Sequence, residues 1–379
     1  SLPFFYFRKL NIIMKYTYLL LISCIIFSCS IDTNQNDSID NYNRTAIIEN
    51  LTNNIIIPSY ENLQSKMIQL SISSVDFRAT QNNSNLTALR KAWKETYISW
   101  QYVEMFTLGK AEEINYIKKM NTYPCNPTVI NQNISNQQYD LSSSNFSSWT
   151  SQGLPAVDYM LYGLDNDSNN ILNIYSGNEG EKYLNYLEDI ISQMSDNTNK
   201  VTDYWKNNKD LIIISNGNTA TSSLNLLAND FIYFYEKGIR ANKIGIPCGR
   251  WDNWDTYPIG VEAYYKKDLS KQLTLAAINS CKQFFSGVGL ITGTNGQSLD
   301  DYLNDINGDN SLTNNIINKL STAEEKINSL DNNFILQMST DNTKMVGAYD
   351  ALQKVVVHLK TDMLISLSIT VDYADADGD

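Results

Sequence analysis

The sequence predicts an all-α protein. Its apolar residues recur three and four positions apart, as on the buried face of a helix, and no stretch of useful length alternates like a half-buried strand. Hydrophobic residues make up 42% and charged residues 18% of the 379 residues, which is enough apolar material for a packed core. The length suits one large domain or two of medium size, and we expect two.

The first 28 residues are interpreted as upstream residues and a lipoprotein signal peptide, and they are excluded from the fold. Lys15 precedes an apolar run over residues 16–28, which is shorter than the roughly 20 apolar residues that span a bilayer. Cys29 then follows a small residue, as at a bacterial lipoprotein cleavage site. We expect lipidation of Cys29 and a polar tether over residues 29–43, with an uncleaved anchor as the alternative.

The charge balance excludes one class of partner. The chain has 29 basic and 41 acidic residues, and removal of residues 1–28 takes away three basic residues and no acidic one. Such a surface repels nucleic acid and anionic lipid, so we expect no nucleic-acid partner. It is compatible with cation binding.

The expected location is the cell envelope, with the protein lipid-anchored to the outer membrane and facing either the periplasm or the outside. The oligomeric state stays open.

In the first half, a kink or break is expected at Pro58. The stretch from Gly153 to Gly163 is typical of a well-started helix, because Pro155 lies in its first turn and Asp158 adds negative charge near the positive end of the helix dipole. Residues 121–149 are expected to be a long polar connection. The expected helices of this half cover residues 46–73, 86–108, 110–119, 153–163 and 179–205.

The second half continues the helical pattern after an irregular segment at residues 242–258. Trp251 and Trp254 in that segment either line a ligand surface or pin the loop to the body of the protein. The expected helices cover residues 220–240, 259–285, 299–305, 312–330 and 344–369. We place an N-terminal helical domain at residues 44–205 and a C-terminal helical domain at residues 206–379.

Few residues offer catalytic chemistry. His358 is the single histidine and lies among valines, where a hydrogen-bonded core histidine is the expected role. A catalytic zinc site or a Ser-His-Asp triad is therefore not expected. Besides Cys29, the mature chain has Cys125, Cys248 and Cys281, which form either a Cys125–Cys248 disulfide or three free thiols.

Trp93 and Glu104 share one face of the helix expected over residues 86–108. An acid on an aromatic stripe must reach water or find a partner. Glu104 is therefore either an edge residue or a carboxylate that faces a site.

The stretch from Gly153 to Gly163, which reads GLPAVDYMLYG, resembles the signature of the imelysin family. These bacterial envelope proteins were first described as insulin-cleaving proteases and are related to iron-uptake lipoproteins. The resemblance implies an all-α fold of two helical-bundle domains packed around an interdomain cleft that holds the site. It runs from about Ile55 to Asp379 and includes Trp93, Glu104, the loop 122–130, the segment 240–249 and Glu262.

The chain departs from the family at the signature itself. The family's Gly-x-His-x-x-Glu places a histidine and a glutamate where both can face one cation, but here Pro155 replaces the histidine and Asp158 the glutamate. Proline offers no lone pair to a metal. In the early helix, Tyr97 replaces the family's arginine, which removes a charged partner for Glu104. The resemblance supports the fold and argues against inherited metallopeptidase chemistry.

The expected function is a non-catalytic envelope lipoprotein that binds a small ligand or a cation in the cleft, with a link to iron uptake. Asp158 and Glu104 are the candidate ligands of a divalent cation or iron, and no residue is assigned a catalytic role. A structural role is the alternative for each site residue. A metal-dependent peptidase and a surface adhesin or complex component are the other functions left open. The expected binding residues are Gly153, Pro155, Asp158, Glu104, Trp93, Arg240 and Glu262.

Overall fold

The computed structural model describes residues 42–251, 253 and 255–372, and those from Tyr42 onward belong to one compact unit. The expected signal peptide, Cys29 and most of the tether lie outside these residues. Helices dominate the described part, which has no strand beyond a single bridge between Val288 and Asn295, so the all-α prediction is confirmed. None of the described helices is both long and apolar enough to cross a membrane.

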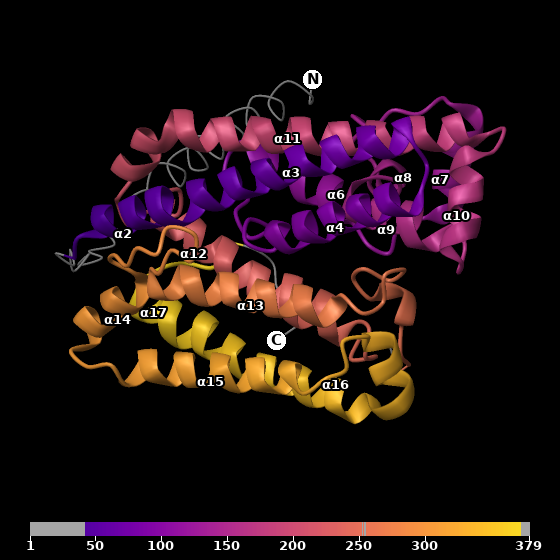
Figure 1. Cartoon of the computed structure of the whole chain (residues 1–379). Coiled ribbons are helices and arrows are strands. Elements are labelled where there is room, and N and C mark those ends of the chain that lie inside the picture. The colour runs from indigo at the N-terminus through magenta and orange to yellow at the C-terminus, as the bar shows by residue number, and fades with distance from the viewer. Residues whose placement is uncertain (1–41, 252, 254, 373–379) are drawn as a thin grey trace, which may run out of the picture. The chain divides into compact units, whose positions relative to one another are not determined.

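One group of long helices comes from the first half. α2 (Arg44–Asn50) continues through a π-helical stretch, η1 (Leu51–Ile56), into α3 (Ile57–Ala79). A kink or a break was expected at Pro58; the π-helical stretch η1 interrupts the α-helical pattern just before this proline, but the chain stays helical on both sides of it. α3 packs against α4 (Asn83–Trp100) and α11 (Gly180–Ile214), as Figure 1 shows.

Shorter elements connect α4 to α11. The polar connection expected over residues 121–149 contains two short helices, each begun by an asparagine side chain that accepts backbone N–H groups. The predicted helix at 153–163 is present as α9 followed by a π-helical stretch, η2. The connecting elements are α5 (Lys110–Glu113), α6 (Tyr116–Asn121), α7 (Pro127–Asn136), α8 (Phe146–Trp149), α9 (Gly153–Asp158), η2 (Tyr159–Gly163) and α10 (Ser168–Ser176).

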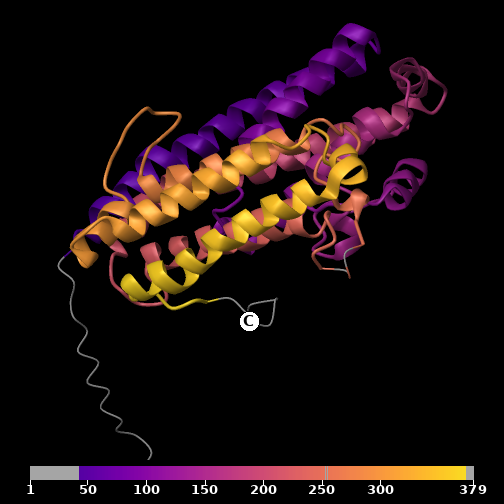
Figure 2. The ribbon, with the colours of Figure 1, turned by 90° about the horizontal axis from the view of Figure 1, so that it is seen from below.

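The second half supplies another group of helices, in which α13, α15, α16 and η3 pack together. The long helices of both groups run in roughly one direction in both views (Figures 1 and 2). The elements are α12 (Ser223–Tyr233), η3 (Phe234–Gly245), η4 (Pro258–Gly260), α13 (Ser270–Ser286), α14 (Leu299–Asn307), α15 (Ser311–Asn328), α16 (Phe334–Val357), η5 (His358–Met363) and α17 (Leu364–Ser366). The domain boundary at residues 205 and 206 stays a prediction.

The helix expected to begin at residue 259 begins at Ser270 instead. Ala263 and Lys267 have φ values of 56° and 65°, in the left-handed region that interrupts an α-helix. The segment 261–267 is therefore irregular, and its backbone N–H groups are available to side chains elsewhere in the chain. That segment forms one wall of the candidate site.

Candidate functional site

The start of α9 is fixed by close packing. Gly153 has a φ of +79°, and a Cβ atom there would lie 2.4 Å from the carbonyl oxygen of Met120. Only glycine allows this conformation and this approach to the end of α6. The indole Nε1 of Trp93 donates to the carbonyl oxygen of Leu154 at 3.1 Å. Gly153 and Trp93 thus position α9, and neither is among the residues that line the cavity beside it.

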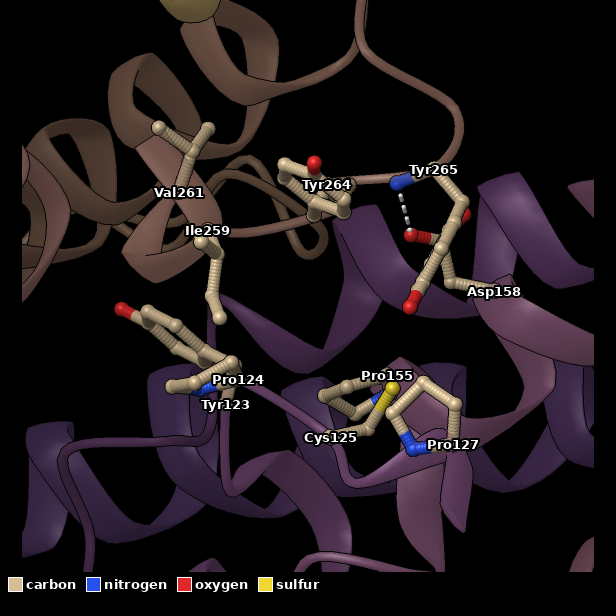
Figure 3. Close-up of a pocket in the computed structure, with 11 residues that line it drawn as sticks. Tyr123, Pro124, Cys125, Pro127, Pro155, Asp158, Ile259, Val261, Tyr264 and Tyr265 are labelled. Carbon is tan, nitrogen blue, oxygen red and sulfur yellow. Dashed lines mark hydrogen bonds between the residues drawn. The ribbon is translucent and has the colours of Figure 1, made fainter. Parts of the chain in front are cut away.

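Asp158 is the last residue of α9, so the stabilisation of the helix start that we expected from it is wrong. Its two carboxylate oxygens accept the backbone N–H groups of Tyr265 at 2.8 Å and Lys266 at 3.0 Å, and Figure 3 shows the first of these bonds. The side chain is 1% exposed. Burial raises its pKa to about 7, although the two hydrogen bonds favour the ionised form.

A cavity of about 210 Å³ lies between α9 and the irregular segment that carries Tyr265. Pro155 and Asp158, which both belong to α9, line it, and Figure 3 labels both side chains. Apart from Asp158, the wall is formed by proline, tyrosine, aliphatic and cysteine side chains. The lining residues are Tyr123, Pro124, Cys125, Pro127, Pro155, Asp158, Ile259, Val261, Ala263, Tyr264 and Tyr265.

Glu104 and Glu262 meet at a second position, around Lys243. The Lys243 ammonium lies 2.6 Å from Oε2 of Glu262 and 3.7 Å from Oε2 of Glu104, and its side chain is 1% exposed. Burial raises the pKa of Glu104. The structure therefore supplies a charged partner for Glu104 from η3, and our expectation that Tyr97 leaves it without one is wrong.

An amide connects these charges. Asn121 Nδ2 donates to Oε1 of Glu262 at 2.8 Å and to Oε1 of Glu104 at 3.1 Å, while the Tyr97 hydroxyl donates to Asn121 Oδ1 at 2.6 Å. Gln101 adds a bond of 3.1 Å to Glu262. Sequence reasoning missed Asn121 and Lys243. The available signal was Lys243 itself, a basic residue within the segment 240–249 that carries part of the family resemblance.

Arg240 belongs to a third cluster. Its guanidinium lies 3.2 Å from Oε1 of Glu236, donates to the hydroxyl of Tyr349 at 3.0 Å and stacks 5.3 Å from the centroid of the Trp251 ring. Trp251 also packs against Tyr349, which supports the interpretation that it pins the loop. Trp254 lies outside the described residues. Arg240 is not among the residues that line the cavity beside α9.

The three cysteines of the described part are free, so a Cys125–Cys248 disulfide is wrong. Cys248 and Cys281 are buried, and Cys125 lines the cavity, where burial raises the pKa of its thiol to about 12. The ring Nδ1 of His358 lies 2.6 Å from a carboxylate oxygen of Asp362 on the same helical stretch, so the expected hydrogen bond is present. The side chain is 21% exposed, however, and the expectation of a core position is wrong.

Comparison with known proteins identifies the family. The family model described as Imelysin matches residues 56–360. The chain belongs to the Imelysin family. Its fold is similar to that of an imelysin-like protein from Psychrobacter arcticum, at 16% identity and a TM-score of 0.67 over 87% of this chain and 97% of that one. No curated protein matches the sequence.

A second solved structure of similar fold comes from Parabacteroides distasonis and is named as an iron-regulated protein A precursor. It is 15% identical, with a TM-score of 0.67 over 86% of this chain and 95% of that one. At these identities the two structures show that the chain has the imelysin fold.

In this imelysin, the acids expected to hold a cation are directed to different partners. Asp158 binds backbone N–H groups, while Glu104 and Glu262 surround an ammonium. Among residues 42–251, 253 and 255–372, no three side chains of His, Cys, Asp or Glu are grouped to hold a metal ion. The cavity beside α9 therefore offers a ligand one ionisable carboxyl group and aromatic walls. These groups can bind a molecule.

Proposed function

We propose that this imelysin is a non-catalytic binding protein of the cell envelope that holds a small organic ligand in the cavity beside α9. The observation that carries the proposal is a single buried acid, Asp158, in a wall that is otherwise apolar or aromatic. Small-molecule sites combine these two features, because the apolar wall provides affinity and a few polar groups fix orientation. The lipid on Cys29 would anchor the protein to the outer membrane.

The size and charge of the cavity define the ligand class. An engineered cavity of about 150 Å³ binds benzene, and this cavity, at about 210 Å³, has room for a ring with a short substituent. A carboxylate offers about four acceptor positions, and Asp158 uses two of them. Because its pKa is about 7, Asp158 is largely ionised above neutral pH. We propose a ligand with a compact apolar body and an amine.

A titration with benzylamine and its neutral analogue benzyl alcohol tests the proposal. Benzylamine should bind several times more tightly at pH 8 than at pH 6, because the ionised fraction of a group with a pKa of about 7 rises about tenfold between them. Benzyl alcohol should show no such rise. Asp158→Asn should remove the pH dependence, and Asp196→Asn, at an exposed position on α11, should keep it. Equal benzylamine binding in wild type and Asp158→Asn would refute the proposal.

Metal analysis and a protease assay test the two competing functions. A metal-dependent peptidase needs a polarising metal or an activated nucleophile. We expect no stoichiometric metal and no cleavage of unfolded protein substrates. Stoichiometric metal with chelator-sensitive cleavage that disappears in Asp158→Ala would establish the peptidase instead, and binding of a cell-surface polymer unaffected by Asp158→Asn would favour the adhesin.

The cellular setting is a further part of the proposal. The name of the Parabacteroides distasonis structure supports a link to iron acquisition, and the sequence around Cys29 supports lipid anchoring. Cys29→Ala should move the protein from the membrane fraction to the soluble envelope fraction. Deletion of the gene should lower cellular iron under iron limitation, and unchanged iron content would contradict the link.

A further inference from the structure

A second hollow, of about 640 Å³, lies beside the first and shares Tyr264 and Tyr265 with it. We call it the Arg90 groove. Its volume falls within the range of small-molecule sites. Unlike the cavity, it is lined largely by polar and charged groups, among them Arg90, Tyr162, Asp165, Asn166 and Lys267.

Arg90 brings a positive charge that no carboxylate in the described part balances. Its Nε and Nη2 donate to the carbonyl oxygen of Leu161 at 3.0 and 2.6 Å, and its Nη1 donates to the hydroxyl of Ser168 at 2.8 Å. The guanidinium stacks 4.4 Å from the ring centroid of Tyr162. These three bonds leave two of the five N–H donors of an arginine for another partner.

The groove contains a second available cation. The exposed ammonium of Lys267 makes no ion pair with any described residue, whereas its neighbour Lys266 is paired with Asp268 at 2.5 Å. Asp165, the acid among the lining residues, accepts the N–H of Asp167 at 2.8 Å and the amide of Asn170 at 3.1 Å. These bonds hold Asp165 within its own loop, where it offsets one of the two cations, Arg90 and Lys267, so the lining residues keep an excess of positive charge.

This excess is unusual in a protein of net charge −12. A partly buried cation normally has a carboxylate partner, because desolvation of an unpaired charge costs free energy. The planar fork of arginine fits a carboxylate. The hydroxyl of Tyr162, for which no described residue provides a hydrogen-bond partner, and the amide of Asn166 can receive hydroxyl groups of a ligand.

We propose that the Arg90 groove binds a small organic acid, with its carboxylate between Arg90 and Lys267 and a hydroxylated ring beside Tyr162 and Asn166. A sugar acid has this chemistry. The groove is a binding site separate from the cavity that Asp158 lines, and it does not depend on the ligand proposed for that cavity.

Calorimetric titration with glucuronate and glucuronamide tests the groove, because the two probes share a ring and differ in charge. Glucuronate should bind and glucuronamide should bind at least tenfold more weakly. Lys267→Gln should weaken glucuronate binding at least threefold, and Arg90→Lys at least tenfold through loss of the fork. Lys354→Gln, at an exposed position on α16 without an ion pair in the described part, is the matched control and should bind as wild type.

Two results would overturn the proposal: equal affinity for the two probes, or the same glucuronate affinity in wild type and Lys267→Gln. Absence of glucuronate binding to the wild type would also overturn it. Because Arg90 also holds Leu161 and Ser168, thermal unfolding of Arg90→Lys shows whether its loss reflects misfolding, while the exposed Lys267 leaves the fold intact. Benzylamine binding by Lys267→Gln should equal that of wild type, so failure at the groove is distinguishable from failure at the cavity.

Discussion

The irregular segment 261–267 contributes to two regions, the Lys243 cluster and the surroundings of Asp158. Buried acids have different partners in the two. Glu262, within the segment, joins Glu104 around the ammonium of Lys243, and amides fill the remaining positions. Three residues later, the backbone of Tyr265 and Lys266 holds Asp158 without an ammonium at ion-pair distance in the described part. The first arrangement places one ammonium between two buried carboxylates, and the second leaves a titratable group beside a cavity.

The largest change in the free energy of unfolding is expected when the ammonium of Lys243 is removed. Lys243→Met should lower the free energy of unfolding by about 3–5 kcal/mol, because it leaves two buried carboxylates without their cation. Urea denaturation at pH 7 measures this. Lys206→Met is the control: it breaks the exposed ion pair with Glu61, with an expected loss below about 1 kcal/mol. A similar small loss in Lys243→Met would show that the buried cluster does not depend on its lysine.

A smaller loss of stability is expected from a substitution at Gly153, where α9 begins. Gly153→Ala should cost about 2–4 kcal/mol, because a methyl group would meet the carbonyl oxygens of Met120 and Lys119 in addition to straining a positive φ. Gly308→Ala separates the two causes. Gly308 has a φ of +69° and open space at its Cβ position, so its loss should be limited to backbone strain of about 1 kcal/mol. Equal losses would remove the packing role assigned to Gly153.

The second region predicts a pH dependence of stability. The pKa of Asp158 is about 7 in the folded protein and about 4 in an unfolded chain. Between about pH 4 and about pH 7 the folded state binds more protons than the unfolded state, so the free energy of unfolding falls as pH rises. The contribution of protonated Asp158 is complete below about pH 4 and is lost as pH rises through 7. Asp230 has the same trend for the same cause, burial, so wild-type stability alone cannot isolate Asp158.

Asp158→Asn isolates this contribution. The free energy of unfolding of wild type minus that of Asp158→Asn should fall by about 1–3 kcal/mol from pH 5 to pH 8, because asparagine does not titrate. Denaturation at both pH values measures the change, and Asp196→Asn should show no change. If the difference between wild type and Asp158→Asn stays constant, Asp158 does not titrate between pH 5 and pH 8. The contrast between a titratable acid beside the cavity and the acids paired with Lys243 would then be lost.

The fold could be predicted from the sequence because its signals are local. Helical periodicity and the signature between Gly153 and Gly163 depend on neighbouring residues and were sufficient for an all-α imelysin. The start of α13 was not predictable by the same means. Apolar spacing continues through residues 259–269, but left-handed conformations at Ala263 and Lys267 interrupt the helix.

The candidate site was predictable only in part. Pro155 and Asp158 line a cavity, as a signature segment suggests, but the partners of Asp158 are backbone N–H groups, which carry no side-chain signal. Lys243 reaches Glu104 from 139 positions away, a pairing that tertiary packing alone creates. Arg240 has a buried cluster of its own, although it lies three residues from Lys243.

The smallest expected effect concerns Cys125, in the wall of the cavity. A reductant should leave the midpoint of thermal unfolding unchanged, whereas loss of a disulfide commonly costs 2–5 kcal/mol. In the native protein at pH 8, iodoacetamide should modify Cys125 very slowly, because a pKa of about 12 leaves on the order of one thiolate in ten thousand. In urea without reductant, Cys125, Cys248 and Cys281 should all be alkylated. A mass spectrum in which Cys125 and Cys248 both stay unmodified would restore the disulfide and would place a crosslink, instead of a free thiol, beside Asp158.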